Sequence, residues 1–237
     1  MKRVLLLLLA ASVACSSPSP YVTTVGVLRP GRTMAVEIES GTLNAYQPAV
    51  GQPRDLFTVS ATAASGATPP PAPRLRRAPL GIVVRAGGKL DSLLVRVPDG
   101  VNLVVQSQRG DVNVTDISGN ARVLARDGNV NLKVPGYAQA AVGHGNLSVM
   151  MGATLWPGTL RFSTQHGDVE VWIESRVAFG AHLHAENGAI FTDFGLRGIS
   201  KGAAETIDGS VNGGTAQRVD IETLDGAIRL LRLQPQP

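Results

Sequence analysis

Cysteine is almost absent from this chain, since Cys15 is the only one among 237 residues. A disulfide framework or a cluster of cysteine metal ligands is therefore excluded. Aromatic residues make up only 4% of the chain, whereas 27 residues are glycine and 43% are hydrophobic. This composition favours a core of Val, Leu, Ile and Ala connected by many tight turns, and it argues against a helical bundle.

The chain also lacks the common signatures of catalysis and of nucleic-acid binding. It contains no GxSxG, HExxH or Walker-type loop, so we expect neither an enzyme nor a bound cofactor. The formal net charge is +4, and Lys2 and Arg3 of an N-terminal leader account for two of these charges. The remaining arginines are scattered and are not interleaved with aromatic residues, so we expect no nucleic-acid partner.

Residues 1–14 are predicted to be a signal peptide, because Lys2 and Arg3 precede an apolar run, Val4–Ala11, that is too short to span a bilayer. The following Ser12–Cys15 resembles the lipobox of bacterial lipoproteins, although Ser12 stands where leucine is usual. The resemblance implies that Cys15 carries a lipid that holds the protein on a membrane, with residues 15–31 as the lipidated cysteine and tether. The alternative is ordinary cleavage that leaves Cys15 as a free thiol.

A four-residue phrase built around glycine recurs seven times in the second half of the chain. The copies are RGDV (109–112), DGNV (127–130), HGNL (144–147), HGDV (166–169), NGAI (187–190), DGSV (208–211) and DGAI (225–228). Their glycines are separated by 18, 17, 22, 21, 21 and 17 residues. A period of this length is typical of stacked repeats rather than of an enzyme built around a pocket.

Short alternating segments flank each of these glycines, and alternation with a period of two indicates β-strands with one buried face. We therefore predict an all-β protein, a single-stranded β-solenoid (β-helix) of about 17–22-residue coils. The alternative is an antiparallel meander or sandwich, in which the Asp-Gly and Asn-Gly pairs would be hairpin turns. The solenoid is preferred because it explains why glycine and an aliphatic residue recur in the same columns.

The rest of the chain divides around this array. Residues 32–62 are predicted to form the N-terminal β coil or coils, because Met34, Val36 and Ile38 face one way and the residues at 35, 37 and 39 (Ala, Glu and Glu) face the other. Residues 63–79 are predicted to be an exposed Pro/Arg-rich insertion loop. The solenoid repeat domain is placed at 80–233 and a tail at 234–237. The arginines at 74, 76 and 77 are expected in a solvated basic loop, with lipid headgroups or an acidic glycan as the alternative partner.

The segments VRVPDGVNLVVQSQRGDVNV (95–114) and ARVLARDGNVNLKVPG (121–136) resemble the bacterial putative-adhesin family of envelope β-solenoids. The shared features are an aliphatic-Pro-x-Gly segment and repeated Gly-Asp/Asn-Val turns, and the resemblance covers about Leu93 to Leu230. It implies a secreted or anchored β-helical domain, and the family offers no catalytic residues to carry over.

These observations lead to one expected function. The chain is expected to be a lipid-anchored protein of the bacterial cell envelope, on the outer membrane, periplasmic face or cell surface. It would act as an adhesin-like binding or scaffolding surface for a glycan or an envelope protein. One alternative is a carbohydrate-active β-helix enzyme, which the small number of aromatic sugar platforms disfavours. The other is an envelope-stress accessory protein that binds a partner protein.

The residue before each glycine is polar in every copy, and in a solenoid these residues would form a ladder along one edge. His144 and His166 would then be neighbours and could share a metal ion with Asp168. Asn and Asp are also ordinary turn residues, so a structural ladder without metal is the preferred interpretation. The tripeptide Arg109–Asp111 is interpreted in the same way, as one copy of the turn.

His182 and His184 are two residues apart and are expected on one outward strand face. Counting back from the glycines places Glu205 and Glu222 in the column of His184, and Asp220 in that of His182. Imidazoles beside carboxylates can bind zinc or transfer protons. The preferred interpretation is a hydrated sheet face with weak cross-strand pairs, and this cluster is the best place to look for a site if the protein has an activity.

Overall fold

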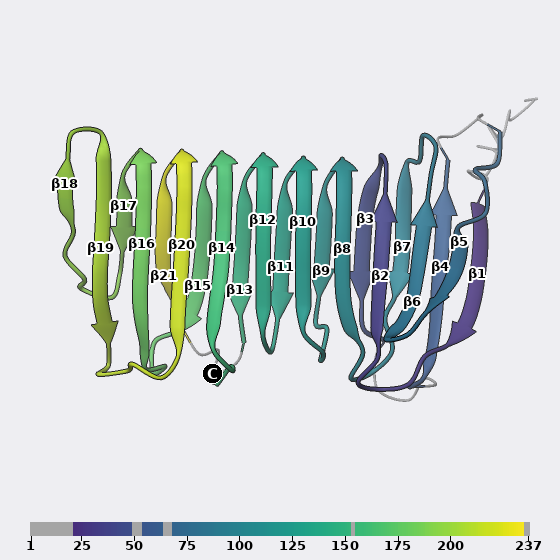
Figure 1. Cartoon of the computed structure of the whole chain (residues 1–237), viewed down its shortest axis with the longest axis horizontal. Coiled ribbons are helices and arrows are strands. Elements are labelled where there is room, and N and C mark those ends of the chain that lie inside the picture. The colour runs from purple at the N-terminus through teal and green to yellow at the C-terminus, as the bar shows by residue number, and fades with distance from the viewer. Residues whose placement is uncertain (1–20, 49–53, 64–67, 153–154, 235–237) are drawn as a thin grey trace, which may run out of the picture.

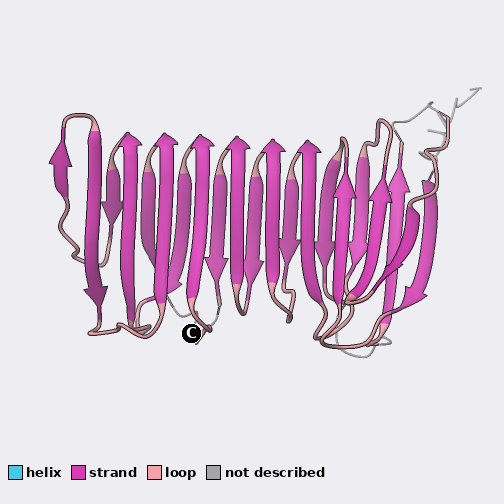
Figure 2. Ribbon diagram, in the orientation of Figure 1, coloured by secondary structure: helices cyan, strands magenta, loops and turns pink. Residues whose placement is uncertain are grey.

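The computed structural model describes residues 21–48, 54–63, 68–152 and 155–234. The predicted signal peptide and Cys15 lie outside the described residues. The described segments contain 21 strands and no helix (Figure 2), and accordingly they include no helix of the length and hydropathy needed to cross a membrane.

The strands form two long sheets that face each other, with the strands side by side along the molecule (Figure 1). The eleven-stranded sheet has the order β18 (Ile199–Lys201), β19 (Ala204–Val211), β16 (Phe179–Asn187), β20 (Arg218–Asp225), β14 (Thr159–His166), β12 (Ala138–His144), β10 (Ala121–Asp127), β8 (Asn102–Arg109), β2 (Thr33–Ile38), β6 (Gly81–Ala86) and β5 (Arg74–Ala78). The ten-stranded sheet has the order β1 (Tyr21–Val27), β4 (Leu56–Thr62), β7 (Ser92–Arg96), β3 (Thr42–Tyr46), β9 (Val112–Thr115), β11 (Val130–Val134), β13 (Leu147–Met151), β15 (Val169–Glu174), β21 (Ile228–Leu233) and β17 (Ile190–Thr192).

Each coil consists of a strand in the eleven-stranded sheet, a turn, and a strand in the ten-stranded sheet. In the middle of the molecule successive coils pair in parallel, and Val112, Val130, Leu147 and Val169 are in register with offsets of 18, 17 and 22 residues. The prediction of an all-β solenoid is confirmed. The antiparallel alternative is wrong for these coils, because β8 to β15 pair with their neighbours in parallel.

The core consists of aliphatic columns that run along the axis between the sheets. One column contains Val105, Val123, Ala140, Phe162, Ile221 and Leu183, and each of these side chains is buried. A second column in the other sheet contains Leu43, Val112, Val130, Leu147, Val169, Ile228 and Ile190. Burying each Val, Leu, Ile or Phe side chain of these columns contributes about 1.5–3 kcal/mol, so the alternation of the sequence is also the main source of stability.

The order of the coils in space departs from their order in the sequence at both ends. The last coil, β20–β21, lies between β14–β15 and β16–β17. The coil β2–β3 lies between β6–β7 and β8–β9. The glycine-marked coils therefore stack in sequence order only as far as β14–β15, because the last coil inserts beside it.

The sixth glycine phrase, DGSV, does not mark a turn between two strands of a coil. Its residues lie within β19, which pairs with β16 in the antiparallel direction and places Gly209 opposite Ala181. The strand closes one end of the eleven-stranded sheet together with the short β18. An Asp-Gly pair in the middle of a strand thus resembles the repeated turn in sequence only.

Two segments near the N-terminus are more ordered than the sequence suggested. Residues 21–27, assigned to the tether, form β1 and pair with β4. Residues 74–78, assigned to the insertion loop, form the edge strand β5 and pair with β6. Pro70 and Pro73 are buried rather than exposed. The predicted N-terminal coil is present as β2–β3, with Met34, Val36 and Ile38 in the core.

Candidate binding face

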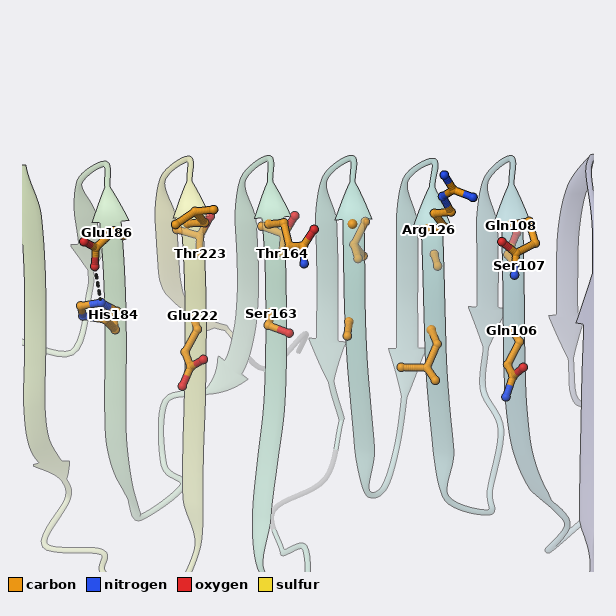
Figure 3. A pocket seen from close by; sticks show the side chains of 17 residues that line it. Gln106, Ser107, Gln108, Arg126, Ser163, Thr164, His184, Glu186, Glu222 and Thr223 are labelled. Atoms are coloured by element: carbon orange, nitrogen blue, oxygen red, sulfur yellow. Dashed lines mark hydrogen bonds and ion pairs between the residues drawn. The ribbon is translucent and has the colours of Figure 1, made fainter.

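A shallow depression of about 680 Å³ lies on the outer face of the eleven-stranded sheet (Figure 3). We call it the binding face. It is lined by two neighbouring columns of outward side chains from β8, β10, β12, β14, β20 and β16. The columns are Gln106, Leu124, Ala141, Ser163, Glu222 and His184, and Gln108, Arg126, Gly143, Gln165, Leu224 and Glu186.

The depression exists because three outward positions in its middle carry small residues. Ala141 and Gly143 lie on β12, and Ser163 lies beside them on β14. The neighbouring strands β10 and β20 carry longer side chains at these positions, so the surface is low in the middle and raised on both sides. No aromatic residue lines it. The floor of the binding face is thus backbone and small side chains, and its walls present mostly amide and charged groups.

One side of the binding face is acidic and contains an imidazole. The Nδ1 atom of His184 is 2.8 Å from Thr206 Oγ1, and its Nε2 atom is 3.1 Å from Glu186 Oε2 (Figure 3). Glu222 is adjacent in register and makes no hydrogen bond or ion pair with any other described residue. Arg126 lies on the opposite side. A polar ligand across the depression would therefore meet a free carboxylate on one side and a guanidinium on the other.

The second predicted column lies just outside the depression. His182 is in register with Asp220, as counted from the sequence, and its Nδ1 atom is 2.7 Å from Asp208 Oδ1. Asp220 lies between two arginines, 3.9 Å from Arg161 Nε and 3.8 Å from Arg218 Nε. The carboxylate of Asp220 is therefore compensated by neighbouring positive charge, unlike that of Glu222.

The predicted position of Glu205 is wrong. It lies opposite Ala185, and Thr206 takes the place beside His184. The count from Gly209 assumed a parallel strand, whereas β19 is antiparallel. The Glu205 carboxylate instead accepts a hydrogen bond of 2.8 Å from the backbone N–H of Ile190. Its position indicates a structural role at the end of the ten-stranded sheet.

His144 and His166 are neighbours, as predicted, and their rings stack with centroids 4.9 Å apart. The Nδ1 atom of His144 is 3.1 Å from Asp127 Oδ1, and that of His166 is 2.7 Å from Asp225 Oδ2. The side-chain amide of Asn187 donates to the other oxygen of Asp225 at 2.8 Å. The residues that precede the glycines thus form a continuous polar ladder along this edge.

Asp168 does not join the two histidines. One carboxylate oxygen accepts a hydrogen bond of 2.8 Å from Ala227 N–H, and the other is 3.0 Å from Arg229 Nη1. The hydrogen bond from Ala227 N–H, and after it the hydrogen bond from Arg229, lowers the pKa of Asp168 below its ordinary value of 3.8. Within the described segments, no three His, Cys, Asp or Glu side chains are grouped in a way that could hold a metal ion.

In the first four copies, the residue after the glycine has a repeated structural role. Asp111 Oδ1 accepts from Asn129 N–H at 2.8 Å, Asn129 Oδ1 accepts from Asn146 N–H at 3.0 Å, and Asn146 Oδ1 accepts from Asp168 N–H at 2.9 Å. Each side chain therefore satisfies a backbone donor of the next coil. The Arg109–Asp111 tripeptide belongs to this series, which explains its aspartate without a receptor.

Sequence reasoning missed Arg126, Glu186 and the small residues that form the floor of the binding face. Neither charged residue belongs to a motif. The available signal was the occurrence of small residues at outward positions of adjacent coils, and its interpretation required the register between them.

Comparison with known proteins identifies the family. No curated protein has significant sequence similarity to the chain. Among solved structures, a putative cell adhesion protein from Clostridium sporogenes is 12% identical, with a TM-score of 0.44, over 90% of this chain and 100% of that one. A putative adhesin from Parabacteroides merdae is 10% identical, with a TM-score of 0.27, over 89% and 96%. Such TM-scores carry no functional argument. Residues 32–231 match the family described as Toastrack DUF4097, and this chain belongs to that family.

Proposed function

We propose that this protein is a non-enzymatic binding protein of the bacterial cell envelope, held on a membrane by a lipid on Cys15, and that its binding face takes a polysaccharide. Support for the ligand class comes from one observation above all. Ala141, Gly143 and Ser163 form a trough of small residues on β12 and β14, and hydrogen-bonding side chains of β8, β10, β14, β20 and β16 surround it.

The spacing of the strands suits a repeating ligand. Neighbouring strands lie about 4.8 Å apart, which is close to the length of one sugar unit in an extended polysaccharide. Glutamine, serine and glutamate side chains along the trough can donate to or accept from sugar hydroxyls. Because aromatic platforms are absent from the face, we expect binding through hydrogen bonds rather than through stacking.

The absence of catalysis is part of the proposal. Glu222 is the free carboxylate of the face, while Glu186 is bonded to His184. The remaining candidate, Glu205, is bonded to Ile190 N–H outside the depression. Two-carboxylate glycoside hydrolysis needs a pair of available carboxyl groups, and Glu222 is the one carboxylate of the face that has no partner among the described residues.

The test is a binding measurement with purified envelope polysaccharides and the full-length chain. Ala141→Trp should abolish binding, because the indole fills the trough while tryptophan remains acceptable in a strand. Ser148→Trp is the matched control, since it makes a similar change in the same coil on the opposite sheet. Glu222→Gln should weaken binding about ten-fold through the loss of a charged hydrogen bond.

Three results would contradict the proposal. The first is equal binding by the Ala141→Trp variant and the wild-type protein. The second is release of new reducing ends that depends on Glu222, which would establish an enzyme. The third concerns the anchor: after expression with labelled fatty acid, Cys15→Ser should remove the label, and a label that persists in this variant would exclude lipidation of Cys15.

A further inference from the structure

The end of the solenoid formed by the edge strands β1 and β5 gathers exposed apolar and basic side chains. We call it the N-terminal end surface. Its apolar members are Tyr21, Val25, Val27, Leu75 and Leu80, which are between 41% and 73% exposed. Its basic members are Arg29, Arg32, Arg74, Arg76 and Arg77, all of which are exposed. In Figure 1 both edge strands lie at the same end of the molecule, opposite β18.

The two edge strands belong to different sheets but meet at this end. A depression of about 510 Å³ is lined by Val27 and Arg29 at the end of β1, by Arg77 of β5, and by Arg32 between them. Arg32 also donates from Nη1 to the carbonyl oxygen of Pro79 at 3.2 Å. Val27 and three of the five arginines of this surface therefore line one depression.

The arginines of this surface have no acidic partners. Among the described residues, none of the five forms an ion pair. Arg85, one strand further in, shows the contrast, since its Nε atom is 2.6 Å from Glu37 Oε2. Apart from the Arg32 Nη1 that donates to Pro79 O, these guanidinium groups are available to an external anion.

The charge of the molecule is segregated along its axis. Residues 21–100 contain nine Lys and Arg against five Asp and Glu, a net charge of +4. Residues 101–237 contain eleven against thirteen, a net charge of −2. The positive pole coincides with the N-terminal end surface. A large anionic surface would therefore attract this end and repel the other.

We propose that the N-terminal end surface lies on the anionic headgroups of a lipid bilayer, so that the solenoid stands on the membrane by this end. Arginine forms paired hydrogen bonds with phosphate, and exposed valine, leucine and tyrosine side chains can enter the interfacial region. A free polyanion would use the arginines but would leave the apolar side chains in water. The combination therefore favours a bilayer.

The position of the chain start agrees with this orientation. Residues 1–20 precede β1, and Cys15 is six residues from Tyr21, a span of at most about 21 Å. The contact itself depends only on described residues, and it needs neither the lipid on Cys15 nor a polysaccharide ligand. The binding face would then extend away from the membrane along the eleven-stranded sheet.

The test uses the full-length chain with vesicles of phosphatidylcholine alone and of phosphatidylcholine mixed with phosphatidylglycerol. Each basic residue near an anionic surface contributes about 1 kcal/mol, or about five-fold in partitioning. The triple variant Arg74→Gln, Arg76→Gln and Arg77→Gln, called the β5 variant, should therefore reduce the preference for anionic vesicles roughly 100-fold. The leader contributes equally to wild type and variant, so the comparison isolates the arginines.

The control removes the same charge from the opposite end. Arg176→Gln, Arg197→Gln and Lys201→Gln alter exposed side chains near β16 and β18, and this variant should keep the wild-type preference. An equal loss in both triple variants would show that only net charge matters and would overturn the proposal. An unchanged preference in the β5 variant would overturn it as well.

A second measurement reports which end touches the lipid. The wild-type chain contains Trp156 and Trp172, so quenching is measured relative to the wild-type protein. With brominated lipids in the anionic vesicles, additional quenching should appear in Tyr21→Trp and not in Ile199→Trp, which carries its new indole at the opposite end. Two results would refute the orientation. One is the reverse quenching pattern. The other is dimerisation of the protein in the absence of lipid, if the β5 variant abolishes it. Polysaccharide binding by the β5 variant should be unchanged. A failure of the membrane-contact proposal can therefore be distinguished from a failure of the polysaccharide-binding proposal.

Discussion

Replacing Gly145 by alanine should destabilise the solenoid far more than replacing a glycine in an ordinary turn. Gly145 has a φ of 137°, and a Cβ atom there would lie 2.2 Å from the carbonyl oxygen of Gly128. The obstacle is backbone and cannot rotate away. The same relation links Gly167 to Gly145, at 2.2 Å. The glycine column therefore exists because each carbonyl occupies the space of its neighbour's missing side chain.

The magnitude follows from two costs. A non-glycine residue in this backbone region costs about 1–3 kcal/mol. Relief of the clash must separate the coils at a point where Gly128 N–H donates to His144 O and Gly145 N–H donates to His166 O, both at 2.9 Å. Weakening one buried hydrogen bond costs about 1–3 kcal/mol. The two costs together predict a loss of about 2–6 kcal/mol, a large part of the stability of a typical domain.

Urea unfolding followed by circular dichroism measures this effect against two controls. Gly158 has a φ of 71° and open space around its Cβ position, so Gly158→Ala should cost about 1–2 kcal/mol from backbone strain alone. Gly136 has open space and no positive φ, so Gly136→Ala should be neutral or stabilising by up to about 1 kcal/mol. Equal losses for Gly145→Ala and Gly158→Ala would refute close stacking as the reason for the glycine column.

Two further predictions concern the core and the turn ladder. Phe162 is 1% exposed at the centre of an inner column, so Phe162→Ala should lower the free energy of unfolding by about 3–5 kcal/mol, measured by urea unfolding; a loss below that of Gly158→Ala would contradict tight packing there. The lowered pKa of Asp168 contributes stability above pH 3.8 that is lost as the pH falls through the folded-state pKa. Unfolding midpoints measured below about pH 5 should therefore fall less steeply in Asp168→Asn than in wild type, and parallel curves would exclude this contribution.

The coil itself could be predicted from the sequence because its causes are local. Alternation assigns the inner face of a strand without knowledge of its neighbours, and residues such as Val123 and Val130 are fully buried as expected. Glycine at a fixed place in each coil marks the point where backbones approach most closely. These two signals were sufficient for the fold class, although they did not reveal the edge strands β1 and β5.

The candidate site was predictable only where register followed from glycine counting. Counting from the glycines gives the correct partners for His182 with Asp220 and for His184 with Glu222, since β16 and β20 are parallel and their glycines are at equivalent positions. It fails for Glu205, because an antiparallel strand reverses the count. The depression itself depends on side-chain size in adjacent strands, which no single segment of sequence reveals.

The order of the coils could not be predicted, because the coils are nearly equivalent as partners. Any coil with glycine at the turn and aliphatic residues inside can pair with any other. The glycine intervals therefore determine the length of each coil but not which coil packs beside it. The antiparallel β19 resolves this ambiguity at one end. It occupies the outer edge of β16 and has no partner strand in the ten-stranded sheet. The only remaining edge of β16 faces the body of the solenoid, and the last coil, β20–β21, must insert there. That coil consequently joins β16–β17 to the rest of the molecule through parallel pairing on both of its sides.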